Sequence, residues 1–397
     1  MTRILFILRG MVPPRPDTER DQFTYWSRIA EGEVLLPVWF RSSDEVDPHL
    51  RATFPKYRVG KFCYHQFLDY RYPRFLRLVA RFVFYISKGF QLHREKQIDV
   101  ILSYGTNLTG IAAVVLKWLT GAKLIAELPN VPENAYRYYA QGEGTVAAIK
   151  RFIANLSQNF VCSSADCLKL LYPWQLYKYP RLQKKRYLVF PTLVSLHTIT
   201  SIPCDEKFIL LVGFPWYTKG ADILIRAFMS IAAQFPDWKL KLLGHYPERV
   251  YLEKLAGGSA QVEFLVARPN DLALQIIGAC SVFVLASRTD AAPVVVREAM
   301  AARKPIIASD VGGVRYFVRD NETGLLFQSE NVEELAAKLT ILLKDPELRA
   351  RLAARGYELV MSEFDENAFV RFIGLRLASL TDDVSGTSAA AVCGSDR

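Results

Sequence analysis

The sequence has few of the features that are typical of secreted, membrane-spanning or zinc-binding proteins. Its six cysteines include no Cys-x-x-Cys pair, which argues against both a zinc site and a disulfide framework. No stretch approaches the ~20 uncharged residues that a membrane-spanning helix needs. The apolar run at residues 4–8 is too short for the core of a signal peptide and predicts a first buried strand instead. We therefore expect a protein of the cytoplasm.

Acidic residues are also scarce, but only in the first half of the chain. Residues 1–200 hold 28 Lys and Arg against 15 Asp and Glu, whereas residues 201–397 hold 22 against 25. The net charge of +10 therefore belongs entirely to the first half. Such asymmetry predicts that the first half faces an anionic partner.

The composition and length indicate two globular domains. Hydrophobic residues make up 51% and charged residues 23% of a chain of 397 residues, which is too long for one ordinary core. Apolar runs alternate with amphipathic helical stretches, which predicts parallel sheets with helices on both faces, an α/β fold of two Rossmann-like domains. In the first half we expect strands near 3–8, 34–39, 99–103, 122–126, 160–163 and 187–190, and helices near 18–30, 70–96, 108–120, 145–157 and 165–171.

A second series of the same kind begins near residue 207. Its expected strands are 208–212, 239–243, 262–264, 282–285, 305–308 and 324–327, and its expected helices are 219–234, 248–256, 270–278, 293–302, 331–344 and 346–361. We place the domains at 1–200 and 205–362. A helix over 363–380 is expected to cross back to the first domain, and residues 381–397 are expected to be disordered.

The segment 282–309 carries one candidate site. A strand is followed by a short loop and a helix that starts around Pro293, where a missing N–H costs nothing. The free amides of Val294 and Val295 predict an anion site. Asp290 and Glu298 can both face the crevice at the carboxyl ends of the strands, where carboxylates suit vicinal hydroxyls. The alternative is that Asp290 only caps the helix and Glu298 lies on a solvated face.

The segment 210–228 carries a second candidate. A buried strand leads to Gly213, and Lys219 with Gly220 is expected to open an amphipathic helix. A lysine beside free helix amides is suited to a diphosphate. The alternative is an ordinary surface lysine at a helix start.

Together these segments resemble the retaining nucleotide-sugar glycosyltransferases of the GT-B fold, of the family-four group. That group shows a strand-Gly-Arg-loop-Lys-Gly element, then an acid followed after seven residues by Glu-Ala-Met-Ala, then a Gly-Gly turn. The matching positions are Gly213, Lys219-Gly220, Asp290, Glu298-Ala-Met-Ala and Gly312-Gly313. The resemblance is specific over roughly 208–359, and over the first 200 residues it rests mainly on strand order.

The resemblance implies two domains facing across a cleft and a sugar donor on the second. Lys219 would neutralise the donor diphosphate, Glu298 would hold the ribose, Asp290 would contact the sugar, and the loop with Arg268 would lie beside the base. It implies front-side transfer with retention and without a metal or other cofactor. The implied donor-binding residues are Gly213, Lys219, Gly220, Arg268, Asp290, Ala292, Pro293, Val294, Val295 and Glu298.

The sequence departs from the family pattern at three places. Asp290 stands where the family usually has Glu, and Phe214 stands where it has a phosphate-binding Arg, which Arg9 could replace. The place of a usual histidine reads Glu127-Leu-Pro-Asn130. The expected acceptor-side residues are Arg9, Gly10, Gly105, Glu127 and Asn130.

The helix expected at 70–96 carries a basic stripe. Arg71, Arg74, Arg77, Arg81 and Lys88 recur at helical spacing, and apolar residues that include Val79, Val83 and Phe90 lie opposite. This pattern suits an anionic membrane at the inner face, with Arg74, Arg77, Arg81 and Lys88 as the contacting residues. The alternative is an ordinary solvated face. Nucleic acid is not expected, because no recognition motif is present.

These expectations converge on a glycosyltransferase. It would move a sugar from a nucleotide-sugar donor to a saccharide or lipid-linked acceptor in the synthesis of cell-surface polysaccharide or glycolipid. Two alternatives stay open: an epimerase or hydrolase of the same fold, for which His245 would supply acid–base chemistry, and a protein that binds a nucleotide sugar without turnover, which Phe214 favours.

Overall fold

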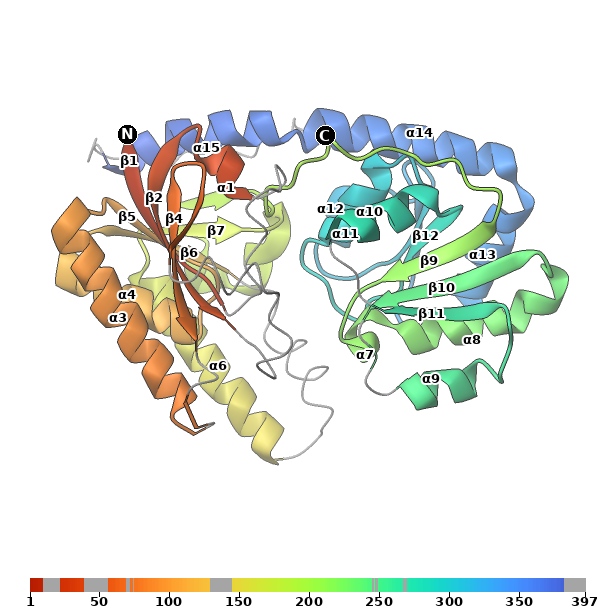
Figure 1. Ribbon diagram of the computed structural model, residues 1–397, viewed down its shortest axis with the longest axis horizontal. Coiled ribbons are helices and arrows are strands. Elements are labelled where there is room, and N and C mark those ends of the chain that lie inside the picture. The colour runs from red at the N-terminus through yellow and green to blue at the C-terminus, as the bar shows by residue number, and fades with distance from the viewer. Residues whose placement is uncertain are drawn as a thin grey trace. The chain divides into compact units, whose positions relative to one another are not determined.

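The computed structural model describes residues 1–9, 22–38, 56–68, 72–73, 75–128, 145–244, 246, 249–266 and 270–381. These residues fall into two compact units, each built on its own sheet (Figure 1). The second unit contains Leu196–Asp365, and the helix that follows it belongs to the first unit. Both sheets are parallel apart from one hairpin, which confirms the predicted α/β class.

The first unit has an eight-stranded sheet in the order β3-β4-β2-β1-β5-β6-β7-β8. Its central strand β1 pairs with β2 on one side and with β5 on the other. The chain therefore turns in opposite directions after β1 and after β5, which makes their carboxyl ends a topological switch point. The strands are β1 (Thr2–Ile7), β2 (Ala30–Val38), β3 (Lys56–Val59), β4 (Phe62–Leu68), β5 (Val100–Ser103), β6 (Lys123–Glu127), β7 (Cys167–Leu170) and β8 (Tyr187–Val189).

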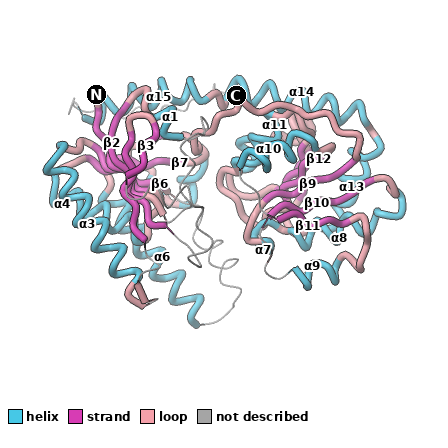
Figure 2. The backbone as a smooth tube through the Cα atoms, in the orientation of Figure 1, coloured by secondary structure: helices cyan, strands magenta, loops and turns pink. Residues whose placement is uncertain are grey.

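Three helices cover one face of this sheet: α3 (Arg77–Lys96), α4 (Leu108–Thr120) and α6 (Thr145–Ser164). Their buried residues form one core with Leu5, Ile101, Leu124 and Leu168 of the strands. The other helices of the unit are α1 (Gln22–Trp26) and α15 (Glu366–Thr381), and the Tyr25 hydroxyl of α1 donates a hydrogen bond of 2.9 Å to Glu366. Two short 3-10 helices, η3 (Pro173–Lys178) and η4 (Pro180–Leu182), precede β8. Figure 2 shows this layering of helices and strands.

The first unit corrects two of the predicted elements. The strand expected at 160–163 is wrong, because α6 continues to Ser164, and the helix expected at 165–171 is wrong, because Cys167–Leu170 is β7. The hairpin of β3 and β4 was not predicted, although Gly60 supplies the positive φ of 56° that its tight turn needs.

Helix α3 also differs from its prediction. It begins at Arg77 instead of residue 70, and Arg71 and Arg74 lie outside the described residues. Arg77, Arg81 and Lys88 are half-buried, whereas Val79, Val83 and Phe90 on the opposite side are exposed. The apolar residues thus face outward, which is the reverse of an ordinary solvated basic face.

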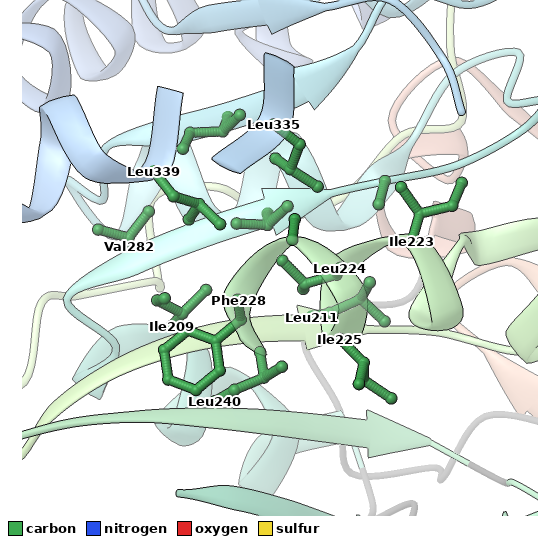
Figure 3. Close-up of a cluster of buried hydrophobic side chains, with 14 of the residues drawn as sticks. Ile209, Leu211, Ile223, Leu224, Ile225, Phe228, Leu240, Val282, Leu335 and Leu339 are labelled. Atoms are coloured by element: carbon green, nitrogen blue, oxygen red, sulfur yellow. The ribbon is translucent and has the colours of Figure 1, made fainter. Parts of the chain in front are cut away.

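The second unit has a six-stranded, fully parallel sheet in the order β11-β10-β9-β12-β13-β14. Its strands are β9 (Lys207–Val212), β10 (Trp238–Gly244), β11 (Val262–Val266), β12 (Val282–Leu285), β13 (Ile306–Ser309) and β14 (Leu325–Phe327), and they agree with the predicted series. Its helices are α7 (Trp216–Lys219), α8 (Ala221–Ile231), α9 (Arg249–Leu255), α10 (Asn270–Ala279), α11 (Val294–Ala301), α12 (Val314–Phe317), α13 (Val332–Lys344) and α14 (Pro346–Glu363), with a short η5 (Ala232–Gln234) after α8. Apolar faces of α8 and α13 meet the strands around Phe228, Leu240 and Leu339 (Figure 3).

A buried carboxylate in the first sheet gives a prediction about stability. Glu33 is hydrogen-bonded to His65 at 2.5 Å and to Lys96 at 2.5 Å. Burial opposes ionisation, but these hydrogen bonds outweigh it and hold the pKa of the Glu33 carboxyl below its ordinary value of 4.5. A lowered pKa stabilises the folded state above about pH 4.5 and loses that effect as the pH falls through the folded value.

We therefore expect Glu33→Gln to lower the free energy of unfolding at pH 7 and to have a smaller effect at pH 3. Urea unfolding at both values measures this. An effect of Glu33→Gln that is the same at the two pH values would contradict the assignment.

Candidate functional site

The candidate site lies where the second sheet reverses its strand order. Strand β9 pairs with β10 on one side and with β12 on the other, and β12 continues to β13. The connections after β9 and β12 therefore lead away from each other, and neither passes over the carboxyl ends of these two adjacent strands. These loops carry Lys219 and Asp290.

Lys219 does not open a long helix, as the sequence suggested, but ends the one-turn helix α7. Lys219 also directly precedes Gly220, the N-cap residue of α8, so it lies beside the free amides at the start of that longer helix. Gly220 follows with φ of 67° and separates α7 from α8. A Cβ at Gly220 would lie 1.9 Å from the carbonyl oxygen of Ala286, so only glycine lets α7 approach the end of β12 this closely.

The side chain of Lys219 crosses Gly213 and reaches Asp290. A Cβ at Gly213 would lie 2.9 Å from Cγ of Lys219, which explains why the residue after β9 is a glycine. Lys219 Nζ forms an ion pair of 2.6 Å with Asp290 Oδ2, and the two side chains are 21% and 12% exposed. The pair is therefore mostly buried but remains partly accessible to solvent. The Ser287 hydroxyl lies 3.5 Å from the same carboxylate oxygen.

The loop after β13 holds the backbone of Asp290. The amide of Gly313 donates a hydrogen bond of 3.2 Å to the Asp290 carbonyl oxygen. Gly312 has φ of 53°, and a Cβ there would lie 1.9 Å from that oxygen. The Gly-Gly turn thus permits the close approach that fixes Asp290.

Helix α11 begins at Val294, with Pro293 as its cap residue rather than its first helical residue. Ala292, Val294 and Val295 are half-buried. Glu298 lies one turn into α11 and is only 8% exposed, so the alternative of a solvated helix face is wrong for it.

Arg288 is a residue of this site that the sequence reasoning missed. Its guanidinium makes two hydrogen bonds of 2.8 Å to the Asp222 carboxylate and one of 2.6 Å to the Tyr217 carbonyl oxygen. Its backbone amide donates to the Thr218 carbonyl oxygen at 2.8 Å. Burial alone would lower the pKa of Arg288, but Asp222 more than reverses this and raises it. Arg288 therefore ties the loop that carries Asp290 to the helix turn that carries Lys219.

The sequence offered a signal for this clamp. Asp222 stands three residues after Lys219 in a strongly apolar helix, and Arg288 stands two residues before Asp290. A charged residue in each apolar segment predicts a buried pair, because isolated buried charges are very costly.

Not every residue that the sequence analysis named for this site lies in the described part of the chain. Arg268 and the alternative acid–base residue His245 lie outside the described residues. Val266 and Phe214 are exposed, and Phe214 supplies no cation in place of the family's Arg.

The described acceptor-side residues lie at the carboxyl ends of β1, β5 and β6 in the first sheet. Arg9 follows β1, and its guanidinium lies against Gly105, where a Cβ would be 2.7 Å from a guanidinium nitrogen. Glu127, at the end of β6, forms an ion pair of 2.5 Å with Lys169 of β7, whose side chain is fully buried. Lys169 also lies over the rings of Tyr104 and Phe190. Gly10 and Asn130 lie outside the described residues.

Comparison with known proteins identifies the second unit. Residues 196–359 match the family described as glycosyl transferases group 1. The second unit belongs to this family. An uncharacterized glycosyltransferase of Haemophilus influenzae is 35% identical over 153 residues, which are 38% of this chain and 43% of that protein. The lipopolysaccharide core biosynthesis glycosyltransferase LpsE of Rhizobium meliloti is 32% identical over 169 residues, 42% of this chain and 48% of LpsE. The chain thus spans less than half the length of these curated relatives.

Solved glycosyltransferase-fold structures are similar in fold to nearly the whole chain, and not only to its second unit. Sucrose-phosphate synthase from Thermosynechococcus elongatus matches with a TM-score of 0.75 and 19% identity, over 97% of this chain and 100% of that one. HepE from Anabaena, solved in complex with UDP-glucose, matches with a TM-score of 0.71 and 16% identity, over 96% and 100% of the two chains. These likenesses show the GT-B fold.

Proposed function

We propose that the protein is a retaining glycosyltransferase that moves a sugar from a nucleotide-diphosphate donor to a saccharide or lipid-linked acceptor. The observation that carries the proposal is the contact of Lys219 with Asp290 at the switch point of a group 1 domain. The UDP-glucose in HepE and the lipopolysaccharide role of LpsE support the donor class and a place in cell-surface polysaccharide or glycolipid synthesis.

The two members of the ion pair would separate when a donor binds. Lys219 Nζ would turn from Asp290 to the diphosphate and neutralise the charge that grows on it as the glycosidic bond breaks. Asp290 would then accept hydrogen bonds from hydroxyls of the transferred sugar. Glu298, one turn along α11, would hold the ribose hydroxyls, and the amides of Ala292, Val294 and Val295 would face the phosphates.

Retention would follow from attack on the same face that the diphosphate leaves. The acceptor hydroxyl would pass its proton to the departing phosphate oxygen, so the protein needs no carboxylate as a nucleophile. The first unit would present the acceptor at Arg9, Gly105 and Glu127. We place the enzyme in the cytoplasm, peripheral at the inner membrane face.

A donor screen tests this function. The protein is incubated with UDP-, GDP- and ADP-sugars, and the release of free nucleoside diphosphate is measured with and without saccharide acceptors. We expect release from the sugars of one nucleotide only. We also expect the coupling constant of the product's anomeric proton in NMR to show the same anomeric configuration as in the donor. An isomerised nucleotide sugar would instead indicate an epimerase, and binding without any product would indicate a protein without turnover.

We further propose that transfer needs no metal, because Lys219 and the helix amides supply the positive charge. We expect EDTA to leave the rate of diphosphate release unchanged, and added Mg²⁺ or Mn²⁺ to change it less than about twofold. Loss of activity in EDTA that is restored by one of these ions would overturn this part of the proposal.

A further inference from the structure

Helix α6 presents an apolar stripe to the outside of the first unit. Ile149, Phe152, Ile153, Leu156 and Phe160 recur at intervals of three and four residues and are all exposed, with Phe152 69% exposed. This spacing is the pattern of a helix face that packs on something. The face that α6 turns to the core includes Val161 and smaller or polar residues, namely Ala154, Gln158 and Cys162.

The stripe continues on the neighbouring helix. Trp118 of α4 is 65% exposed and packs edge-on against Phe160, with ring centroids 6.0 Å apart. Exposed apolar residues of α3, such as Val79 and Val83, belong to the same helical layer (Figure 1). A contiguous exposed apolar surface of this kind marks an interaction site.

The charges on this layer select the partner. Helices α3, α4 and α6 together hold eight Lys and Arg but one acid, Glu95, and two of these cations, Lys96 and Lys117, are paired with Glu33 and Asp166 of neighbouring segments. Lys150 and Arg151 flank the stripe within α6 itself. Apolar residues with an exposed tryptophan, bordered almost only by cations, complement an anionic bilayer surface. A second copy of the chain would bring like charges together.

We propose that the outer stripe of α6, with Trp118 of α4, inserts into the headgroup region of a membrane rich in anionic lipid. This surface differs from the basic stripe predicted on α3, since apolar side chains of α6 and α4 make the contact and cations surround it. It would hold the enzyme at the bilayer where a lipid-linked acceptor lies. No helix in the described part of the chain is long and apolar enough to cross a membrane, so the contact is at the surface.

Flotation of the full chain with vesicles tests the proposal. Vesicles of phosphatidylcholine alone are compared with vesicles of equal parts phosphatidylcholine and phosphatidylglycerol, at low salt and without any sugar donor. We expect binding to the anionic vesicles only. The variant Phe152→Ser/Leu156→Ser should bind about tenfold more weakly or worse, and so should Lys150→Glu/Arg151→Glu.

The matched control is Val250→Ser/Ile341→Ser, which removes two exposed apolar residues of the second unit and should bind as the unchanged protein does. Emission of Trp118 should shift to shorter wavelength on binding, and Trp118→Phe should abolish that shift. Thermal unfolding checks that each variant is folded.

Three results would overturn the proposal: no binding to anionic vesicles, equal loss in the control, or a dimer in light scattering that Phe152→Ser/Leu156→Ser converts to monomer. The last result would assign the stripe to a second copy. Because the assay contains no donor, its failure is distinct from failure of the proposed sugar transfer.

Discussion

Replacing Lys219 by alanine is expected to lower kcat by about 10²–10³-fold while leaving the fold intact. The lysine forms an ion pair of 2.6 Å with Asp290, and its side chain is 21% exposed. Without it, charge that develops on the leaving diphosphate has only helix amides to stabilise it. Steady-state rates of diphosphate release measure the loss, and thermal unfolding measures the fold.

Lys239→Ala is the matched control for this prediction. Lys239 also belongs to the second unit and also pairs with carboxylates, those of Glu206 and Glu263, at 2.9 and 2.6 Å. It lies on β10, away from the switch point, so its removal should leave kcat within about twofold. Equal rates for Lys219→Ala and the unchanged protein would remove Lys219 from the site.

Replacing Arg288 by methionine is expected to have the largest effect on stability in the second unit, a loss of about 3–5 kcal/mol. The change leaves the buried Asp222 carboxylate without its bidentate partner, and an uncompensated buried charge is strongly unfavourable. Urea unfolding measures the loss. Arg319→Met, which removes an exposed partner of Glu363, should cost under about 1 kcal/mol.

The double variant Arg288→Met/Asp222→Leu separates positioning from stability. Removing both charges should restore most of the lost unfolding free energy, because no buried charge is left unpaired. The kcat should nevertheless stay about 10²-fold low, since only the backbone amide of residue 288 then ties the loop of Asp290 to the turn of Lys219. Recovery of full activity with stability would show that Arg288 only supports the fold.

The second unit could be predicted from sequence nearly element by element. Its strands are continuous apolar runs and its helices have regular apolar faces, so local pattern and final structure agree. The local pattern could not predict which residues from different strands and loops come into contact. The sequence placed Lys219 at the start of a long helix, whereas Lys219 ends the one-turn helix α7, and Gly220 with its positive φ separates α7 from the long helix α8.

The first unit was harder to predict because its long-range contacts override local preference. Strand β7 contains Lys169, whose buried ammonium is possible only because Glu127 of the next strand and two aromatic rings surround it. When these contacts are not known, a short apolar run that contains a lysine is more readily interpreted as an amphipathic helix than as a buried strand. The end of α6 misled in a similar way, because Phe160, Val161 and Cys162 form a short apolar run that resembles a buried strand.

The acceptor residues had the least support in the sequence. Arg9 and Gly105 are far apart in the chain and meet only because β1 and β5 are neighbours in the sheet. Sequence spacing carries no information on such a contact, whereas strand order does.

Isothermal titration calorimetry tests the central claim most directly. The nucleoside diphosphate that the donor screen identifies is titrated into the unchanged protein and into Lys219→Ala, Glu298→Ala and Lys239→Ala. If Lys219 and Glu298 belong to one diphosphate and ribose site, each of their variants should bind at least about tenfold more weakly, and Lys239→Ala should bind normally. Undiminished binding by both Lys219→Ala and Glu298→Ala would place the nucleotide elsewhere and contradict the account.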